Sequence, residues 1–158
     1  MQADEFPVLL RELTIPGATV GPVVNDKGEP AKPGSGLQYG FRVVGKHGAC
    51  IIWQVALQGD GAQASGSAVF PAAVPAQPDK LVTADVEASI AAWIGQSEAA
   101  GHVVNLKRYS QASPVSGLRY GLALTLDTGG RVFIQPLWTL ETNERPTKDN
   151  KCKIRDVV

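Results

Sequence analysis

The strongest constraint on the fold is a segment that occurs twice in the chain. Residues 33–40, Pro-Gly-Ser-Gly-Leu-Gln-Tyr-Gly, return at 114–121 as Pro-Val-Ser-Gly-Leu-Arg-Tyr-Gly, with six of the eight positions identical. The register then continues without a gap, so that Gly48 matches Gly129 and Gln54 matches Gln135. Self-similarity of this kind is typical of a duplicated supersecondary unit. The sequence therefore predicts two related halves.

Hydrophobic periodicity and turn residues predict the same order of elements in each half. The expected elements are a helix at 4–13, a strand at 18–24 and a hairpin of 37–44 with 49–57, then a helix at 84–99, a strand at 102–109 and a hairpin of 118–127 with 131–140. The halves, about 4–57 and 84–140, are joined by a Gly-, Ala- and Pro-rich segment at 58–80. We expect one α+β domain, residues 1–158, in which two helix–strand–hairpin units form a curved antiparallel sheet, or two packed sheets, with the helices on one face.

The helix at 84–99 carries an apolar stripe of Val86, Ile90, Trp93 and Ile94. Thr83 is the expected N-cap, and Glu87 suits the positive end of the helix dipole.

Alternation along the hairpins predicts which side chains face the core. On this basis Leu37, Tyr39, Phe41 and Val43 point to the core, as do Leu118, Tyr120, Leu122, Leu124 and Leu126. The opposite face would be polar and partly aromatic, and it supplies the candidate binding residues. These candidates are Arg42, Gln54, Arg119, Arg131, Phe133 and Gln135. Whether they share one face depends on the hairpin register, which the sequence leaves open.

Composition limits the classes of partner. The chain is 44% hydrophobic, and its 15 basic residues balance its 15 acidic ones, which argues against strong general binding to nucleic acid or anionic membranes. The charge is uneven, because residues 1–100 hold 6 basic and 10 acidic side chains and residues 101–158 hold 9 and 5. Two isolated cysteines favour a reducing compartment, and neither a membrane span nor a secretory signal is recognisable. We expect a cytoplasmic protein of bacterial or phage type.

The motifs of catalysis and metal binding are missing from the sequence. Two histidines and two cysteines give no zinc-ligand spacing, and there is neither a nucleophile elbow nor a phosphate-binding loop. We expect no cofactor, no metal and no enzymatic activity. Asp127-Thr128-Gly129 resembles the catalytic triplet of aspartic proteases. That resemblance implies a hydrolase whose paired carboxylates come from a homodimer, but Asp-Thr-Gly-Gly is also an ordinary hairpin turn.

Three functions follow, in order of preference. The first is a non-catalytic protein-interaction module, of the inhibitor, immunity or phage-accessory type, that uses a sheet face or the 58–80 loop. The second is a single-stranded nucleic-acid binder that uses the Arg/Gln/aromatic face, and the third is a hydrolase with Asp127. Pro136 lacks an N–H, so its strand lies at an edge or contains a bulge. An edge there would favour a homodimer.

Overall fold

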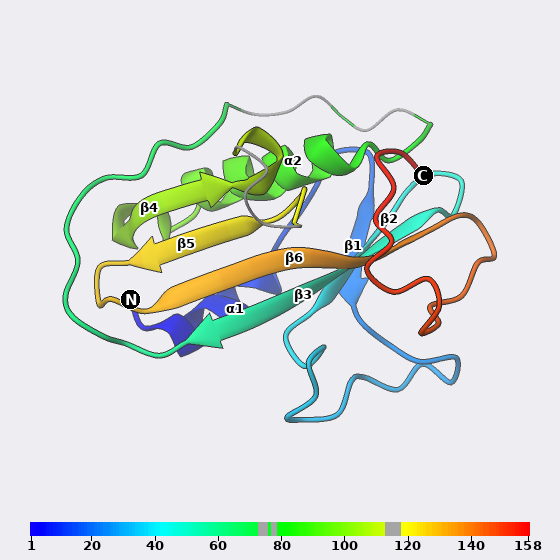
Figure 1. Ribbon diagram of the computed structural model, residues 1–158, viewed down its shortest axis with the longest axis horizontal. Helices are drawn as coiled ribbons and strands as arrows, with labels where there is room; N and C mark the ends of the chain where they lie inside the picture. The colour runs from blue at the N-terminus through cyan, green and yellow to red at the C-terminus, as the bar shows by residue number, and fades with distance from the viewer. Residues whose placement is uncertain (73–75, 77–78, 113–117) are drawn as a thin grey trace.

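The computed structural model describes residues 1–72, 76, 79–112 and 118–158, and its centre is a single antiparallel sheet. The sheet has six strands in the order β1-β2-β3-β6-β5-β4 (Figure 1). The strands are β1 Thr19–Pro22, β2 Phe41–Val44, β3 Cys50–Gln58, β4 Val103–Arg108, β5 Leu122–Leu126 and β6 Arg131–Leu140. The helices are α1 Phe6–Leu10 and α2 Thr83–Gln96, with short 3-10 turns η1 Ala3–Glu5, η2 Ala100–His102 and η3 Tyr109–Gln111. The α+β class is confirmed, and one sheet rather than two packed sheets is formed.

Both predicted hairpins are present, and glycines form their turns. In the first, the amide of Gly45 donates to the carbonyl of Ala49 over 2.8 Å, and Gly48 has a φ of +91°. In the second, Leu126 donates to Gly130 over 2.8 Å, and Gly129 has a φ of +82°. Left-handed φ values favour glycine because it has no Cβ.

The two hairpins also have the same register. Phe41 pairs with Trp53 in the first, and Leu122 pairs with Ile134 in the second. Each residue of the second pair follows its counterpart by 81 positions, which is the offset of the sequence repeat. The hairpins meet through β3 and β6, where Gln54 pairs with Gln135.

The first strand of each hairpin begins later than predicted. Residues 37–40 form a turn closed by a hydrogen bond of 3.0 Å from Gly40 to Leu37, and β2 starts at Phe41. The alternation rule therefore does not apply to the repeated segment, and placing its side chains in the core was wrong. Tyr39 and Leu118 are exposed, Tyr120 is half-buried, and Leu37 joins a separate cluster. Residues 113–117, which include the start of the second copy, lie outside the described part.

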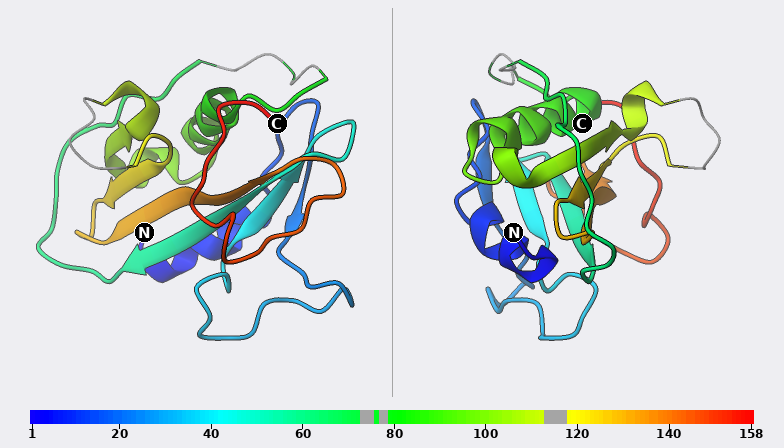
Figure 2. Two further views of the ribbon diagram at one scale, coloured as in Figure 1. Left: turned by 45° about the vertical axis from the view of Figure 1, so that its right-hand side comes forward. Right: turned by 90° about the vertical axis from the view of Figure 1, so that its left-hand side faces the viewer.

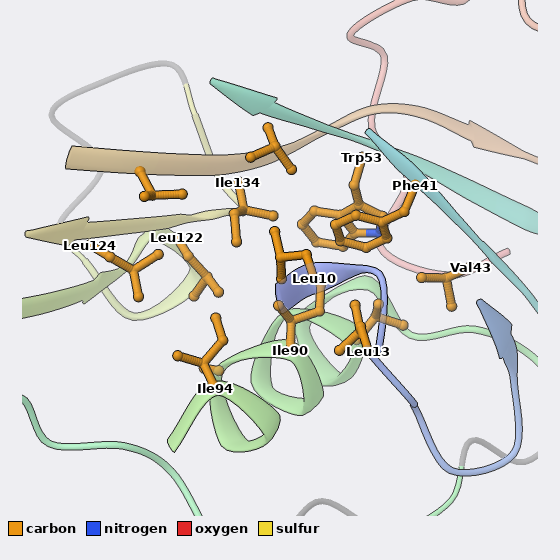
Figure 3. Packing of buried hydrophobic residues seen from close by; sticks show 14 of the residues in the cluster. Leu10, Leu13, Phe41, Val43, Trp53, Ile90, Ile94, Leu122, Leu124 and Ile134 are labelled. Carbon is orange, nitrogen blue, oxygen red and sulfur yellow. The ribbon is translucent and has the colours of Figure 1, made fainter. Parts of the chain in front are cut away.

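The main hydrophobic core combines residues of the helices and of the sheet. Leu10, Leu13, Ile90 and Ile94 meet Phe41, Trp53, Leu122, Leu124 and Ile134, as Figure 3 shows. Val86, Ile90 and Ile94 of the predicted stripe are fully buried, and Trp93 is partly buried against the same cluster. The Trp53 ring stacks on that of Phe41 with centroids 6.3 Å apart.

The start of α2 differs from the prediction. The N-cap is Val82, and the hydroxyl of Thr83 instead donates to the carbonyl of Arg155 over 2.6 Å. The C-terminal segment is thereby fixed to the helix start.

A second, smaller cluster covers part of the other sheet face. Cys50, Ile52 and Leu140 form it, with Leu37 and Trp138 packed against them. Cys50 and Ile52 alternate along β3 with Ile51 and Trp53 of the main core, so the two clusters lie on opposite faces. Trp138 Nε1 donates to the carbonyl of Thr147 over 3.0 Å. In the right-hand view of Figure 2, the C-terminal segment runs on the side of the sheet away from α1.

Pro136 lies inside the sheet, because β6 is flanked by β3 and β5. It pairs with Trp53 at the point where the register shifts between Ile52 and Trp53. The predicted bulge is confirmed. The alternative of an edge strand is wrong, and with it the argument for a homodimer through this strand.

The described part of the 58–80 connection is held against the rest of the chain. It passes the β5–β6 turn and follows β4 (Figure 1), where Ala68 donates to Val103 over 3.2 Å. Phe70 then packs on Gly95 of α2, where an added Cβ would lie only 2.6 Å from the Phe70 side chain. Of the predicted anchor pair, Val69 is exposed. Residues 73–75 and 77–78 lie outside the described part. No described helix combines the length and apolar character needed to cross a bilayer.

Candidate functional site

Four of the six candidate binding residues lie together on one face. Arg131, Phe133 and Gln135 occupy alternate positions of β6, and Gln135 pairs with Gln54 of β3. Residues at alternate positions share a face, and so do directly paired residues. The intervening Val132 and Ile134 are fully buried in the main core, so the four candidates lie on the opposite side.

The other two candidates lie away from this group. Arg42 is on the same face, but its Nε donates to the carbonyl of Pro22 on the edge strand over 3.2 Å. It lies beside Cys50, where burial raises the thiol pKa to about 11 and the Arg42 charge opposes the shift. Arg119 precedes β5 and donates to Asp156 over 3.1 Å and to the carbonyl of Ile154 over 2.6 Å.

The sequence analysis missed two residues that complete the group. Lys107 of β4 pairs with Ala123, which pairs with Phe133, so all three share the face. Tyr109 follows two positions after Lys107, and the Lys107 ammonium lies 5.2 Å from the centre of its ring. The alternation of Asn105, Lys107 and Tyr109 along the predicted strand was the signal available. It acquired meaning only once the partner of that strand was known.

We call this surface the open face. Its members come from β3, β4, β5 and β6 and from the first residue after β4. They are Gln54, Ala56, Gln58, Asn105, Lys107, Tyr109, Ala123, Thr125, Arg131, Phe133 and Gln135. The set contains two cations, two aromatic rings and several amides, and none of these residues is acidic.

The aromatic rings of the open face lie beside small residues and cations. Phe133 is paired with Ala56 on one side and Ala123 on the other, so neither neighbour has a side chain long enough to cover it. The Arg131 guanidinium lies 5.0 Å from the centre of the Phe133 ring. Each ring thus has a cation close to it, an arrangement that suits flat, anionic ligands.

Gly121 provides the space for Tyr109. Its φ is +134°, and an added Cβ would lie 2.8 Å from the carbonyl oxygen of Ile134. The same point is 3.2 Å from the Tyr109 ring and 3.3 Å from Cβ of Gln135, so these two side chains approach each other over the glycine.

A buried carboxylate holds the backbone that carries Tyr109. Glu87 of α2 is fully buried and accepts hydrogen bonds from Arg108 Nε over 3.1 Å and from the Ser110 amide over 3.2 Å. It also accepts from the Ser110 hydroxyl and, over 2.8 Å, from the Gly121 amide. Glu87 is therefore more than a dipole-compensating residue, because it fixes the residues on both sides of Tyr109.

Asp127 lies in the β5–β6 turn and not on the open face. Its Oδ2 is 2.7 Å from Nδ1 of His102, and this hydrogen bond lowers the Asp127 pKa. A lowered pKa keeps the carboxylate ionised, whereas an aspartic protease must hold a proton between two carboxylates. The local contacts suit a charged turn residue.

No group of three or more His, Cys, Asp or Glu side chains in the described part of the chain is placed to hold a metal ion. Comparison of the chain with family models, curated proteins and solved structures found no match.

Proposed function

We propose that this protein binds single-stranded nucleic acid on the open face. The supporting observation is the juxtaposition of Lys107 and Arg131 with Tyr109 and Phe133 on a surface without carboxylates. Bases stack on exposed aromatic rings, and cations neutralise the phosphates between them. The sequence alone favoured a protein-interaction module, and the register changes this order because it unites the predicted residues with two further ones.

The shape of the open face favours unpaired bases over a duplex. A base in a duplex has both of its flat faces covered by neighbouring base pairs, whereas stacking on Tyr109 or Phe133 needs a free one. Ala56, Ala123 and Gly121 keep the surroundings of the rings low. The zero net charge of the chain predicts moderate affinity that falls with salt.

A protein-binding function is the second candidate, and a different surface supports it. A pocket of about 310 Å³ lies beside edge strand β1 and is lined by Leu10, Val20 and Tyr39 among others. Tyr39 is 38% exposed. An edge strand next to an apolar pocket suits an extended peptide, or the edge of a second copy of this chain.

Two further expectations stay as proposals. The equal hairpin registers support an origin of the halves 4–57 and 84–140 by duplication, as does the role of Gly40. An added Cβ at Gly40 would lie 2.6 Å from the carbonyl of Trp53, as one at Gly121 would approach Ile134. Cys50 and Cys152 are free thiols, which suits the cytoplasmic location that the sequence predicts.

The test is fluorescence anisotropy with a labelled thymidine oligonucleotide of about 12 nucleotides at low salt. Tyr109→Ala and Phe133→Ala should each weaken binding about tenfold, in line with roughly 1–3 kcal/mol per stacked base. The matched controls Tyr39→Ala and Lys46→Ala change exposed residues that lie outside the open face. Absence of binding by the unaltered protein would refute the proposal, as would equal losses in the controls. Preference for duplex over single strand would contradict the stacking argument.

A further inference from the structure

A groove next to the open face has the chemistry of a second nucleotide site. It has a volume of about 590 Å³ and lies between β6, the residues that precede β5, and the C-terminal segment. Its walls include Leu118, Arg119, Leu137, Lys153 and Arg155. Gln135 lines the groove and also belongs to the open face, so the two surfaces are continuous.

The charged side chains that line the groove are all basic: Arg119, Lys153 and Arg155. Two of them are held in place by carboxylates outside the lining. Asp156 binds Arg119 over 3.1 Å, and Glu144 binds Arg155 over 2.8 Å. A guanidinium has five N–H donors, so each arginine keeps donors for a ligand. The Lys153 ammonium has no ion-pair partner among the described residues and gives the groove a net positive charge.

The rest of the lining is suited to a flat, weakly polar group. Leu118 is 44% exposed, and Leu137 and Ile154 add aliphatic surface. Tyr120 stands beside Arg119, whose guanidinium lies 5.4 Å from the ring centre. A nucleotide combines an anionic phosphate with a flat base, and the groove offers cations and apolar walls in the same space.

We infer that this groove binds the next nucleotide of the strand that lies on the open face, with its phosphate at Arg119 and Lys153. This inference rests on the proposed function, because the open face supplies the rest of the strand. It brings Arg119 into the binding surface as a phosphate-binding residue separate from the sheet. The path of the strand then runs from Phe133 past Gln135 into the groove.

The first test compares thymidine oligonucleotides of about 4 and about 12 nucleotides, short enough for the open face alone and long enough to reach the groove. The double variant Arg119→Ala, Lys153→Ala should weaken binding of the longer strand about tenfold and leave the shorter one unchanged. It should also lower the salt dependence by the equivalent of one or two phosphates, about 1 per contact. Lys148→Ala is the control, because this exposed lysine does not line the groove. Equal effects on both lengths, or none on the longer strand, would overturn the inference.

The second test is independent of the open face. Titration with thymidine monophosphate, followed by amide NMR, should shift the signals of residues 118–120 and 150–155 in the unaltered protein and not in the double variant. Stationary signals there would overturn the groove as a nucleotide site. If neither oligonucleotide binds while the monophosphate shifts these signals, the proposed function fails and the nucleotide site in the groove stands. If the oligonucleotides bind and these signals stay fixed, the groove fails alone.

Discussion

Nε2 of Gln135 donates a hydrogen bond of 3.1 Å to Oε1 of Gln54 across the two central strands of the sheet. The two glutamines occupy equivalent positions of the sequence repeat, and they pair directly with each other. An antiparallel pair of equivalent strands has such a self-paired position only at its centre. The glutamine pair therefore marks the middle of the sheet and joins its halves at the border of the open face.

This pair should contribute a measurable coupling energy. Both side chains are half-buried, so a net value of about 0.5–1.5 kcal/mol is expected for their hydrogen bond. A double-mutant cycle of Gln54→Ala and Gln135→Ala in urea unfolding measures it. Strict additivity of the two losses would show that the hydrogen bond does not stabilise the fold.

Glu87 should matter for stability and for ligand binding. Glu87→Gln places an NH₂ group among donors and leaves Arg108 without its counter-charge. We expect a loss of about 1–3 kcal/mol in the free energy of unfolding, with Glu98→Gln, an exposed residue after α2, as control. We also expect weaker oligonucleotide binding, an effect that should vanish in a Tyr109→Ala background because Glu87 acts through Tyr109. An undiminished effect in that background would contradict the positioning role.

Glycine is required at the two positions where strands β2 and β5 begin. Gly40→Ala and Gly121→Ala place a Cβ 2.6 Å and 2.8 Å from backbone carbonyl oxygens, which forces the strands apart. Gly121 also has a φ of +134°, and strain of this kind costs about 1–3 kcal/mol. Gly59→Ala is the control, since nothing lies within 4 Å of its added Cβ. Urea midpoints that fall equally in all three variants would contradict the steric argument.

The hairpins were predictable because turn chemistry and alternation are local. Gly48 and Gly129 stood where the turns form, and Leu122, Leu124 and Leu126 alternated toward the core as expected. The assignment of 37–40 to a strand failed because the close approach of Gly40 to Trp53 is a tertiary contact.

The composition of the site was only partly predictable. Phe133 and Gln135 were found by alternation, yet their common face with Gln54 depended on a pairing that no local pattern fixes. Lys107 reached the site through β5, a partner that the sequence does not reveal. Glu87 looked like an acidic residue in the first turns of a helix, and only packing showed that it is buried.

Low pH should remove the contribution of Asp127 to stability. The hydrogen bond with His102 lowers the Asp127 pKa below its ordinary value of 3.8. Because the folded-state pKa is the lower one, this stabilisation is complete above the unfolded-state value and disappears as the pH falls through the folded-state value. Urea midpoints of the unaltered protein and of Asp127→Asn should therefore differ at pH 7 and converge toward about pH 2. A difference that stays constant over this range would rule out the ionised pair as its source.

The two cysteines should report on the groove. Burial raises the Cys50 pKa to about 11, so this thiol stays protonated and protected, whereas Cys152 is exposed and lines the groove. Because the thiolate is the nucleophile, an aromatic disulfide reagent should label one thiol rapidly in the folded protein, and Cys152→Ser should abolish this phase. An oligonucleotide of about 12 nucleotides should slow the labelling, while one of about 4 should not, since only the longer strand reaches the groove. Rapid labelling of Cys50 would contradict its burial, and equal protection by both lengths would place Cys152 on the path of every bound strand.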